Sequence, residues 1–359
     1  MSYLLASGVA FPPHRYSQAD LVEALLELWG EQLFNPDRLR SFFSSVSVDE
    51  RYLALPKERY GEIRDFKSRN LAWREVAMDL LTGLTPEVAQ QAGLELGSLD
   101  FLVSTTVTGL AVPTLEARLM NRLPISKSVK RLPLFGLGCL AGAAGVARLH
   151  DLLRDSDRCG LLLAVELCSL TLRTSDVSVA NLISTGLFGD GAAAVAMAGP
   201  GHPSVLEAGK SGPLCQIVDT RSVLFAESEY VMGWEFDSEG FSIVLAGDVP
   251  DYAAGPVSQG VRNFLAEHDL SPEGVHHWLA HPGGPKVMDA LEQGLGLPGA
   301  LALSREALAK EGNLSSVSVL SILHKVLTSG RPKEGDWGVL MAMGPAFCAE
   351  IVLLRWTSN

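Results

Sequence analysis

The sequence predicts a mixed α/β fold built from two related halves. Short segments that are apolar at nearly every position, such as 159–169 "CGLLLAVELCS" and 191–199 "GAAAVAMAG", are typical of buried strands. The segment 98–109 predicts another strand, and between it and 159–169 lies a helical apolar pattern that follows Cys139. This order of strand, helix and strand is that of a βαβ unit.

The N-terminal region, residues 14–95, predicts helices around the first half. The stretches 17–30 "SQADLVEALLELWG" and 84–96 "LTPEVAQQAGLEL" each offer a Ser or Thr N-cap, followed by an acidic residue in the first turn. We therefore expect one helix to begin near each of these caps.

The second half repeats the alternation of strand and helix. Residues 276–284 "HHWLAHPGG" predict a strand that ends in a Gly-Pro loop, and 284–297 predict the following helix. Residues 335–344 and 347–356 predict the two closing strands. A weak internal sequence repeat places the boundary between the halves near residue 205. We therefore expect halves 1–205 and 206–359 that pack as one body.

Composition and charge exclude several classes of protein. The chain has 359 residues, of which 47% are hydrophobic and 19% charged, a globular composition whose apolar excess favours a homo-oligomer. The net charge of −12, with no basic stripe, argues against nucleic acid as a partner. No signal peptide, membrane span or CxxC pair is recognisable, so we expect a cytoplasmic protein with reduced cysteines.

One cysteine stands out, in 132–153 "LPLFGLGCLAGAAGVARLHDLL". Cys139 could be a small packing residue, part of a phosphate-binding glycine loop, or a nucleophile. The glycine register is not G-x-G-x-x-G and no Gly-Lys-Ser/Thr follows, which disfavours dinucleotide or phosphate binding. A thiol at a helix N-terminus lies at the positive end of the helix dipole, which favours the thiolate. The small residues 141–145 would also let the helix pack closely against its neighbours.

A nucleophilic cysteine needs a base and a group that orients it or stabilises charge. His281 follows an apolar strand and precedes a Gly-Pro loop, and Asn313 stands between a glycine and an apolar helix, where an N-cap role explains it equally well. The pair His276–His277 lacks ligands at metal-binding spacing, so no metal site is predicted. From the residues alone, Cys139, His281 and Asn313 form one of several conceivable constellations.

Five separated stretches, in order, resemble the type III polyketide synthases, the chalcone- and stilbene-synthase-like family, in its bacterial form. They are "GCLAG" around Cys139, "LFGDGAAAV" at 187–195, "HPGGPKVMDALE" at 281–292, "GNLSSVSVL" at 312–320 and "DWGVLMAMGP" at 336–345. The resemblance covers nearly the whole chain. It implies a thiolase-like fold of two αβαβα halves forming a five-layered core, a homodimer, and a triad of Cys139, His281 and Asn313.

The resemblance also implies an acyltransferase chemistry. Cys139, as a thiolate paired with protonated His281, would take an acyl group from an acyl-CoA. Malonyl-CoA would then lose CO2, and His281 and Asn313 would stabilise the resulting enolate before condensation and cyclisation. No metal or redox cofactor is implied, because CoA thioesters are the substrates.

Seven further positions are assigned to substrate binding by the resemblance: Phe188, Thr171, Val112, Ile243, Gly344, Pro345 and Ser315. Phe188 would be a gatekeeper, although an ordinary core aromatic explains it too. The sequence departs from the plant members, which have Gly-Phe-Gly-Pro-Gly where 342–346 read Ala-Met-Gly-Pro-Ala. Ile243 replaces a second gatekeeper phenylalanine, and Val112 replaces the residue, often methionine, that reaches into the partner's cavity.

The small side chains at Ile243 and Val112 indicate extra room. We therefore predict a medium- or long-chain fatty acyl-CoA starter, extended with malonyl-CoA to an alkylpyrone or alkylresorcinol. The alternative is a ketoacyl synthase III-like enzyme that condenses once and uses an acyl carrier protein. A Cys-His-Asn protease is disfavoured because its C-G-S-C-W-like surroundings and signal peptide are missing. A non-catalytic scaffold is disfavoured by the presence of all three triad residues.

Overall fold

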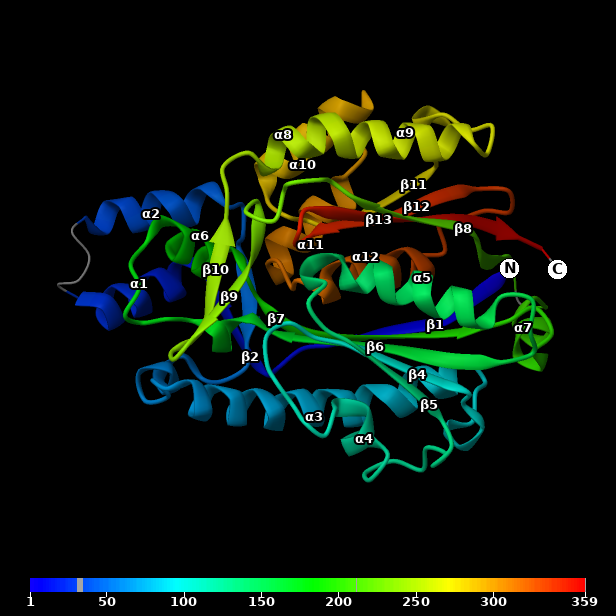
Figure 1. The fold of residues 1–359 in the computed structure, drawn as a ribbon, viewed down its shortest axis with the longest axis horizontal. Helices are drawn as coiled ribbons and strands as arrows, with labels where there is room; N and C mark the ends of the chain where they lie inside the picture. The colour runs from blue at the N-terminus through cyan, green and yellow to red at the C-terminus, as the bar shows by residue number, and fades with distance from the viewer. Residues whose placement is uncertain (31–34, 211, 359) are drawn as a thin grey trace.

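A computed structural model describes residues 1–30, 35–210 and 212–358 and arranges them in five layers (Figure 1). The outermost helix on one side is α3 (Phe66–Gln91), and α9 (Ser258–Ala266) and α10 (Pro285–Leu295) cover the other side. Between these outer layers lie two groups of strands that enclose α5 (Ala141–Leu153) and α12 (Ser316–Thr328). The predicted five-layered core is confirmed.

The first half contributes five strands in the order β1-β7-β6-β4-β5. Their bounds are β1 (Ser2–Ala10), β4 (Phe101–Thr105), β5 (Lys130–Leu134), β6 (Cys159–Leu167) and β7 (Asp190–Ala198). β4 runs parallel to β6, as the predicted βαβ unit requires, whereas β7 runs antiparallel to both β6 and β1. Every residue of β6 and β7 is buried, which explains why their sequences are almost wholly apolar.

The second half contributes four strands in the order β11-β12-β13-β8. Their bounds are β8 (Leu214–Leu224), β11 (His277–Ala280), β12 (Trp337–Gly344) and β13 (Cys348–Thr357). The predicted strands at 276–284, 335–344 and 347–356 are therefore confirmed, as is the helix α10. The two groups of strands join where Ser2, Tyr3 and Leu4 of β1 pair with β8.

The small residues after Cys139 allow α5 and α12 to approach closely. Residues 141–147 of α5 are all buried. A Cβ atom at Gly142 would lie 2.1 Å from the carbonyl oxygen of Ser316 on α12, so only glycine fits at this crossing. The expectation that this helix is packed in the interior is confirmed.

The prediction of a helix beginning near Thr85 is wrong. α3 begins at Phe66, where the Asp65 side chain accepts a hydrogen bond from the Ser68 amide (2.8 Å), and continues through Pro86. Thr85 is buried and donates its hydroxyl to the Leu81 carbonyl (2.6 Å), a mid-helix contact rather than a cap. The other predicted helix is confirmed as α1 (Gln18–Trp29), capped by Ser17.

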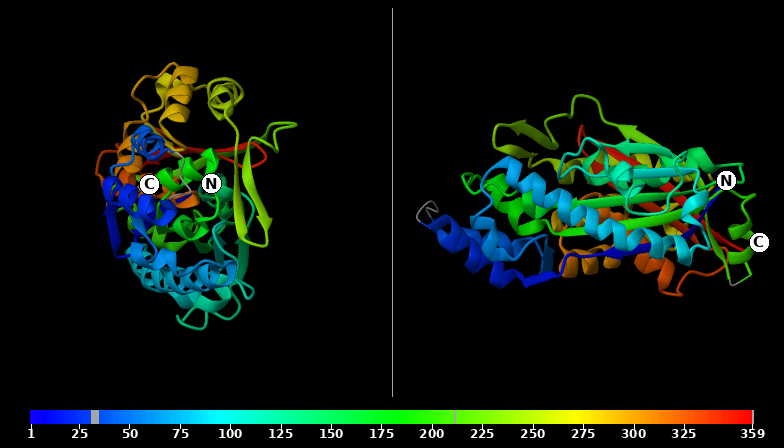
Figure 2. Two further views of the ribbon diagram at one scale, coloured as in Figure 1. Left: turned by 90° about the vertical axis from the view of Figure 1, so that its left-hand side faces the viewer. Right: turned by 90° about the horizontal axis from the view of Figure 1, so that it is seen from below.

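The remaining elements surround the layered body. They include β2 (His14–Ser17), α2 (Pro36–Ser45), β3 (Glu50–Leu53), η2 (Lys57–Gly61), α4 (Leu115–Leu119), α6 (Val179–Leu187), α7 (Pro203–Ala208), the β9 (Met232–Asp237) and β10 (Gly240–Leu245) hairpin, α8 (Val249–Tyr252) and α11 (Ala302–Glu311). Figure 2 shows the hairpin on the outer side of the body. Within the described residues, no helix has the length and apolar character needed to cross a bilayer.

Candidate active site

Cys139 lies at a tight turn between β5 and α5. The turn forms the short helix η4 (Gly138–Leu140), and Gly138 has a positive φ of 53°. A Cβ atom at Gly138 would also lie 2.6 Å from Cδ of Pro345, so both the backbone and the space require glycine. The position predicted for Cys139, at the start of a buried helix, is confirmed.

His281 follows the last residue of β11. Its backbone amide donates to the Met341 carbonyl of β12 (2.9 Å), which continues the strand pairing and fixes the residue. The side chain is buried, and its Nδ1 atom has no hydrogen-bond partner among the described residues. Nε2 is therefore the ring nitrogen left to face open space.

Asn313 lies just before α12, but it is not the N-cap, which is Ser315. Its Oδ1 atom accepts a hydrogen bond from the Ser315 amide (2.8 Å). Because a backbone N–H can only donate, this bond fixes the orientation of the side-chain amide. The Nδ2 donors are consequently turned away from Ser315.

These three side chains line one cavity, which we call the cysteine cavity. It has a volume of about 270 Å³ and extends past the hairpin residues Ile243 and Leu245 to the exposed Lys286 at the start of α10. Cys139 comes from the first half of the chain, whereas His281 and Asn313 come from the second. The structure thus brings together the three residues that the sequence predicted.

Burial keeps the reactive groups uncharged when each is considered alone. Burial raises the pKa of Cys139 to about 12, opposed by a contact of Sγ with Oγ of Ser315 (3.6 Å). Burial lowers the pKa of His281 to about 3. Burial therefore opposes the effect expected of the helix N-terminus, which favours the thiolate. Transfer of the proton from Cys139 to His281 would form the thiolate and the imidazolium together, and each charge would then favour the other.

A buried carboxyl group, Glu166 of β6, lies near the cysteine. It accepts hydrogen bonds from Ser316 Oγ (2.5 Å), Thr108 Oγ1 (2.8 Å) and the Val107 amide (3.1 Å). Burial raises its pKa to about 7, and its charge contributes to the raised pKa of Cys139. Sequence reasoning missed Glu166, although a carboxylate inside the run "LLLAVEL" was a visible signal.

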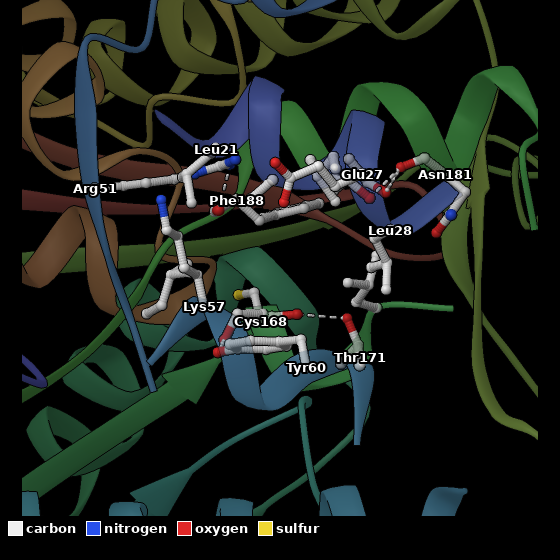
Figure 3. A pocket seen from close by; sticks show the side chains of 18 of the residues that line it. Leu21, Glu27, Leu28, Arg51, Lys57, Tyr60, Cys168, Thr171, Asn181 and Phe188 are labelled. Atoms are coloured by element: carbon white, nitrogen blue, oxygen red, sulfur yellow. Dashed lines mark hydrogen bonds between the residues drawn. The ribbon is translucent and has the colours of Figure 1, made fainter. Parts of the chain in front are cut away.

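A second cavity, of about 390 Å³, lies on the other side of Phe188 (Figure 3). We call it the arginine cavity, because Arg51 of β3 contributes a buried guanidinium to its wall. Phe188 and Trp234 line both cavities and form the shared wall between them. Neither Arg51 nor Trp234 was identified from the sequence.

The other predicted cavity residues have different positions. Ile243 and Pro345 line the cysteine cavity, and Thr171 lines the arginine cavity. Gly344 and Ser315 both contact the turn that carries Cys139. A Cβ atom at Gly344 would lie 2.8 Å from the Leu137 carbonyl oxygen, and Oγ of Ser315 contacts Sγ of Cys139. Val112 is 96% exposed and lines neither cavity of its own chain.

One of the two adjacent histidines at 276–277 contacts an aspartate. Nε2 of His277 lies 2.8 Å from Oδ2 of Asp336, in the turn before β12. Across the described parts of the chain, no group of three His, Cys, Asp or Glu side chains is arranged to hold a metal ion.

Family models and known proteins match this chain along nearly its whole length. Residues 1–200 match the sequence model of "Chalcone and stilbene synthases, N-terminal domain", and residues 216–358 match that of the C-terminal domain. The chain is 47% identical to the 1,3,6,8-tetrahydroxynaphthalene synthase of Streptomyces peucetius subsp. caesius, over 98% of this chain and 92% of the relative. It is 30% identical to the 3,5-dihydroxyphenylacetyl-CoA synthase of Streptomyces toyocaensis, over 98% and 90%.

A solved structure is similar throughout. The 1,3,6,8-tetrahydroxynaphthalene synthase of Streptomyces coelicolor A3(2), described as a bacterial type III polyketide synthase, superposes with a TM-score of 0.91 at 26% identity. The match covers 99% of this chain and 100% of that chain.

Proposed function

This chain belongs to the chalcone and stilbene synthase family and is a type III polyketide synthase, and from that premise we propose that it uses malonyl-CoA both to prime and to extend a chain that cyclises to a polyhydroxylated naphthalene. Enzymes of this family act on CoA thioesters and need no cofactor beyond them. A naphthalene skeleton can be built wholly from two-carbon units, so no separate starter is needed. The relative with 47% identity carries the name of such a product.

The observation that carries the short starter is the position of Trp234. Ile243 of β10 was expected to leave room for a long chain, but its paired residue on β9 is Trp234. Side chains directly opposite each other in a strand pair share one face. The indole therefore lies beside Ile243, and with Phe188 it narrows the space between the two cavities that both residues line.

In the proposed mechanism, His281 takes the proton of Cys139 as Sγ attacks the thioester carbon of the starter. CoA leaves as the thiolate and takes a proton from solvent, so His281 stays protonated. A second malonyl-CoA loses CO2, and the electron pair moves onto its thioester oxygen. Nδ2 of Asn313 and the protonated His281 donate hydrogen bonds to that oxygen. The enolate carbon then attacks the acyl carbon on Cys139, and the cysteine leaves as the thiolate.

A fatty acyl starter, leading to an alkylpyrone or alkylresorcinol, is the second candidate. It is favoured by the aliphatic lining of the arginine cavity, which contains Leu21, Leu25, Leu28, Leu53 and Leu172. An acyl chain held on Cys139 would reach this cavity by passing between Phe188 and Trp234, which line both cavities. The one-round alternative with an acyl carrier protein has no support from the family matches.

The test is product analysis by mass spectrometry of the purified enzyme. The first reaction contains malonyl-CoA alone, and the second adds hexanoyl- or lauroyl-CoA. A polyhydroxylated naphthalene formed from malonyl-CoA alone supports the proposal. If products form only with the added acyl-CoA and retain its chain, the malonyl starter is wrong and the fatty acyl starter is right.

We also propose that the enzyme is a homodimer. Members of the family are typically dimeric, and the almost complete exposure of Val112 supports a position at the interface. Size-exclusion chromatography with light scattering would give the mass of the protein in solution. A monomer at micromolar concentration would overturn this proposal.

A further inference from the structure

Arg51 is a buried cation whose donors are only partly used. Its side chain extends from β3 into the wall of the arginine cavity, where Figure 3 shows it beside Phe188, and the residue is 2% exposed. Nη1 donates to the Phe188 carbonyl (2.8 Å). Nε is buried without a partner, and Nη2 makes no hydrogen bond within the described part of the chain. A guanidinium in this state is costly unless another group supplies acceptors.

The carboxylate of Asp190 makes no hydrogen bond or ion pair with Arg51 in the described part of the chain. Asp190 is buried nearby, but its carboxylate already accepts hydrogen bonds from the Ala54 amide (2.5 Å) and from the amide (2.8 Å) and hydroxyl of Ser169. Among the described residues, no carboxylate lies within ion-pair distance of Arg51. Burial lowers the pKa of Arg51 to about 10, so it still carries its charge at neutral pH.

Three of the uncharged polar side chains of the cavity are hydrogen-bonded within the protein. Thr171 Oγ1 donates to the Cys168 carbonyl (2.7 Å), and Tyr60 shares a hydrogen bond with Ser169 Oγ (2.5 Å). Asn181 Nδ2 donates to the carbonyls of Arg173 (3.1 Å) and Asp176 (2.6 Å). Arg51 therefore offers free donors to a cavity whose lining also contains Lys57, Glu27 and Glu58 and an aliphatic part made by leucines.

Resting on the proposed function, we propose that Arg51 binds the keto and enolate oxygens of the growing polyketide chain in the arginine cavity. Oxygens on alternate carbons form 1,3-related pairs, and a β-dicarbonyl readily becomes an enolate. A guanidinium presents parallel donors that match such paired acceptors better than a single ammonium does. By holding Phe188 with Nη1, Arg51 also couples chain binding to the wall between the two cavities.

The test compares R51Q and R51K with a matched control, R15Q, which alters an exposed arginine on the neighbouring strand β2. Products from malonyl-CoA are separated by chain length, and malonyl-CoA decarboxylation is measured in parallel. Decarboxylation needs only the cysteine cavity, so we expect it to stay close to wild type. The ratio of full-length cyclised product to shorter lactones should fall about tenfold in R51Q and less in R51K.

A lysine at position 51 keeps a donor near the Phe188 carbonyl but not the parallel donors of the guanidinium. If Arg51 only anchored Phe188, R51K would keep the wild-type product lengths, and that result would overturn the inference. If the enzyme uses a starter other than malonyl-CoA, but the product lengths still depend on Arg51, only the proposed function is overturned. The two failures are therefore distinguishable.

A binding measurement covers the case in which the variants fail to fold. C139A with Arg51 intact is titrated with a 3,5-dioxo acyl thioester of N-acetylcysteamine and with the matching dihydroxy compound. We expect the dioxo compound to bind about tenfold more tightly, because only it can form an enolate. Equal affinities would overturn the inference.

Discussion

The cysteine cavity and the arginine cavity share a wall but use opposite electrostatic designs. In the first, burial disfavours charge on both titratable groups, Cys139 and His281, unless they exchange a proton. In the second, Arg51 keeps its charge although it is buried. Bond-making needs groups that can pass a proton between them, whereas holding a flexible chain needs a fixed charge. The contrast matches the two tasks proposed for the two cavities.

The largest effect is expected from removing the nucleophile. C139A should lower product formation by at least about a thousandfold, since no acyl-enzyme can form. The arginine cavity is untouched, so the thermal unfolding temperature should stay near that of wild type. Mass spectrometry of products and of the intact protein checks both the turnover and the missing acyl adduct.

C215A is the control, because Cys215 is buried in the sheet and lines neither cavity. Acylation of C139A at another cysteine would contradict the assignment of Cys139.

The next effect concerns proton exchange in the cysteine cavity. In H281Q the thiol has no base, and its pKa is raised by burial, so the thiolate fraction at pH 7 should be very small. Alkylation of Cys139 by iodoacetamide should then be about a hundredfold slower than in wild type at pH 7. The rate should keep rising up to pH 10.

The measurement is a pH series of alkylation rates for wild type and H281Q, with the surface variant H276Q as control. Equal profiles for wild type and H281Q would show that His281 does not take the proton.

Removing a side chain from the shared wall should let a longer acyl chain pass between the two cavities. W234A removes the indole that lines both, so lauroyl-CoA should be accepted as a starter with about tenfold higher kcat/KM. E235A, on the same strand but exposed, is the control. If lauroyl-CoA use is unchanged in W234A while the variant remains folded, Trp234 does not limit the starter.

The smallest effect is expected at Val112. A larger side chain, as in V112W, should reduce lauroyl-CoA loading if the loop enters the partner's cavity. Turnover with malonyl-CoA alone should stay within about twofold of wild type, because short chains leave that space free. Unchanged loading of lauroyl-CoA in V112W would place Val112 away from the acyl chain.

The residues of the cysteine cavity could be predicted from sequence because each stands at the end of a strongly patterned element. Cys139 precedes a helix of small residues, and His281 ends an apolar strand. The helix start near Thr85 could not be predicted correctly, since a Thr-Pro pair looks the same at a cap and inside a long helix. Arg51 and Trp234 could not be found because their role comes from contacts across a cavity. The neighbour of Ile243 could not be found for the same reason: Trp234 pairs with it across two strands, so the room beside Ile243 cannot be judged from that residue alone.

The turn that carries Cys139 packs against Pro345, which lies more than half the chain away in sequence. The nucleophile is synthesised first, and its base, its amide and the proline that closes its turn all come later. A nascent or truncated chain therefore carries a thiol with no proton acceptor and no enclosed cavity. The cavity around Cys139 is therefore complete only after the later part of the chain has been synthesised and has packed against the earlier part.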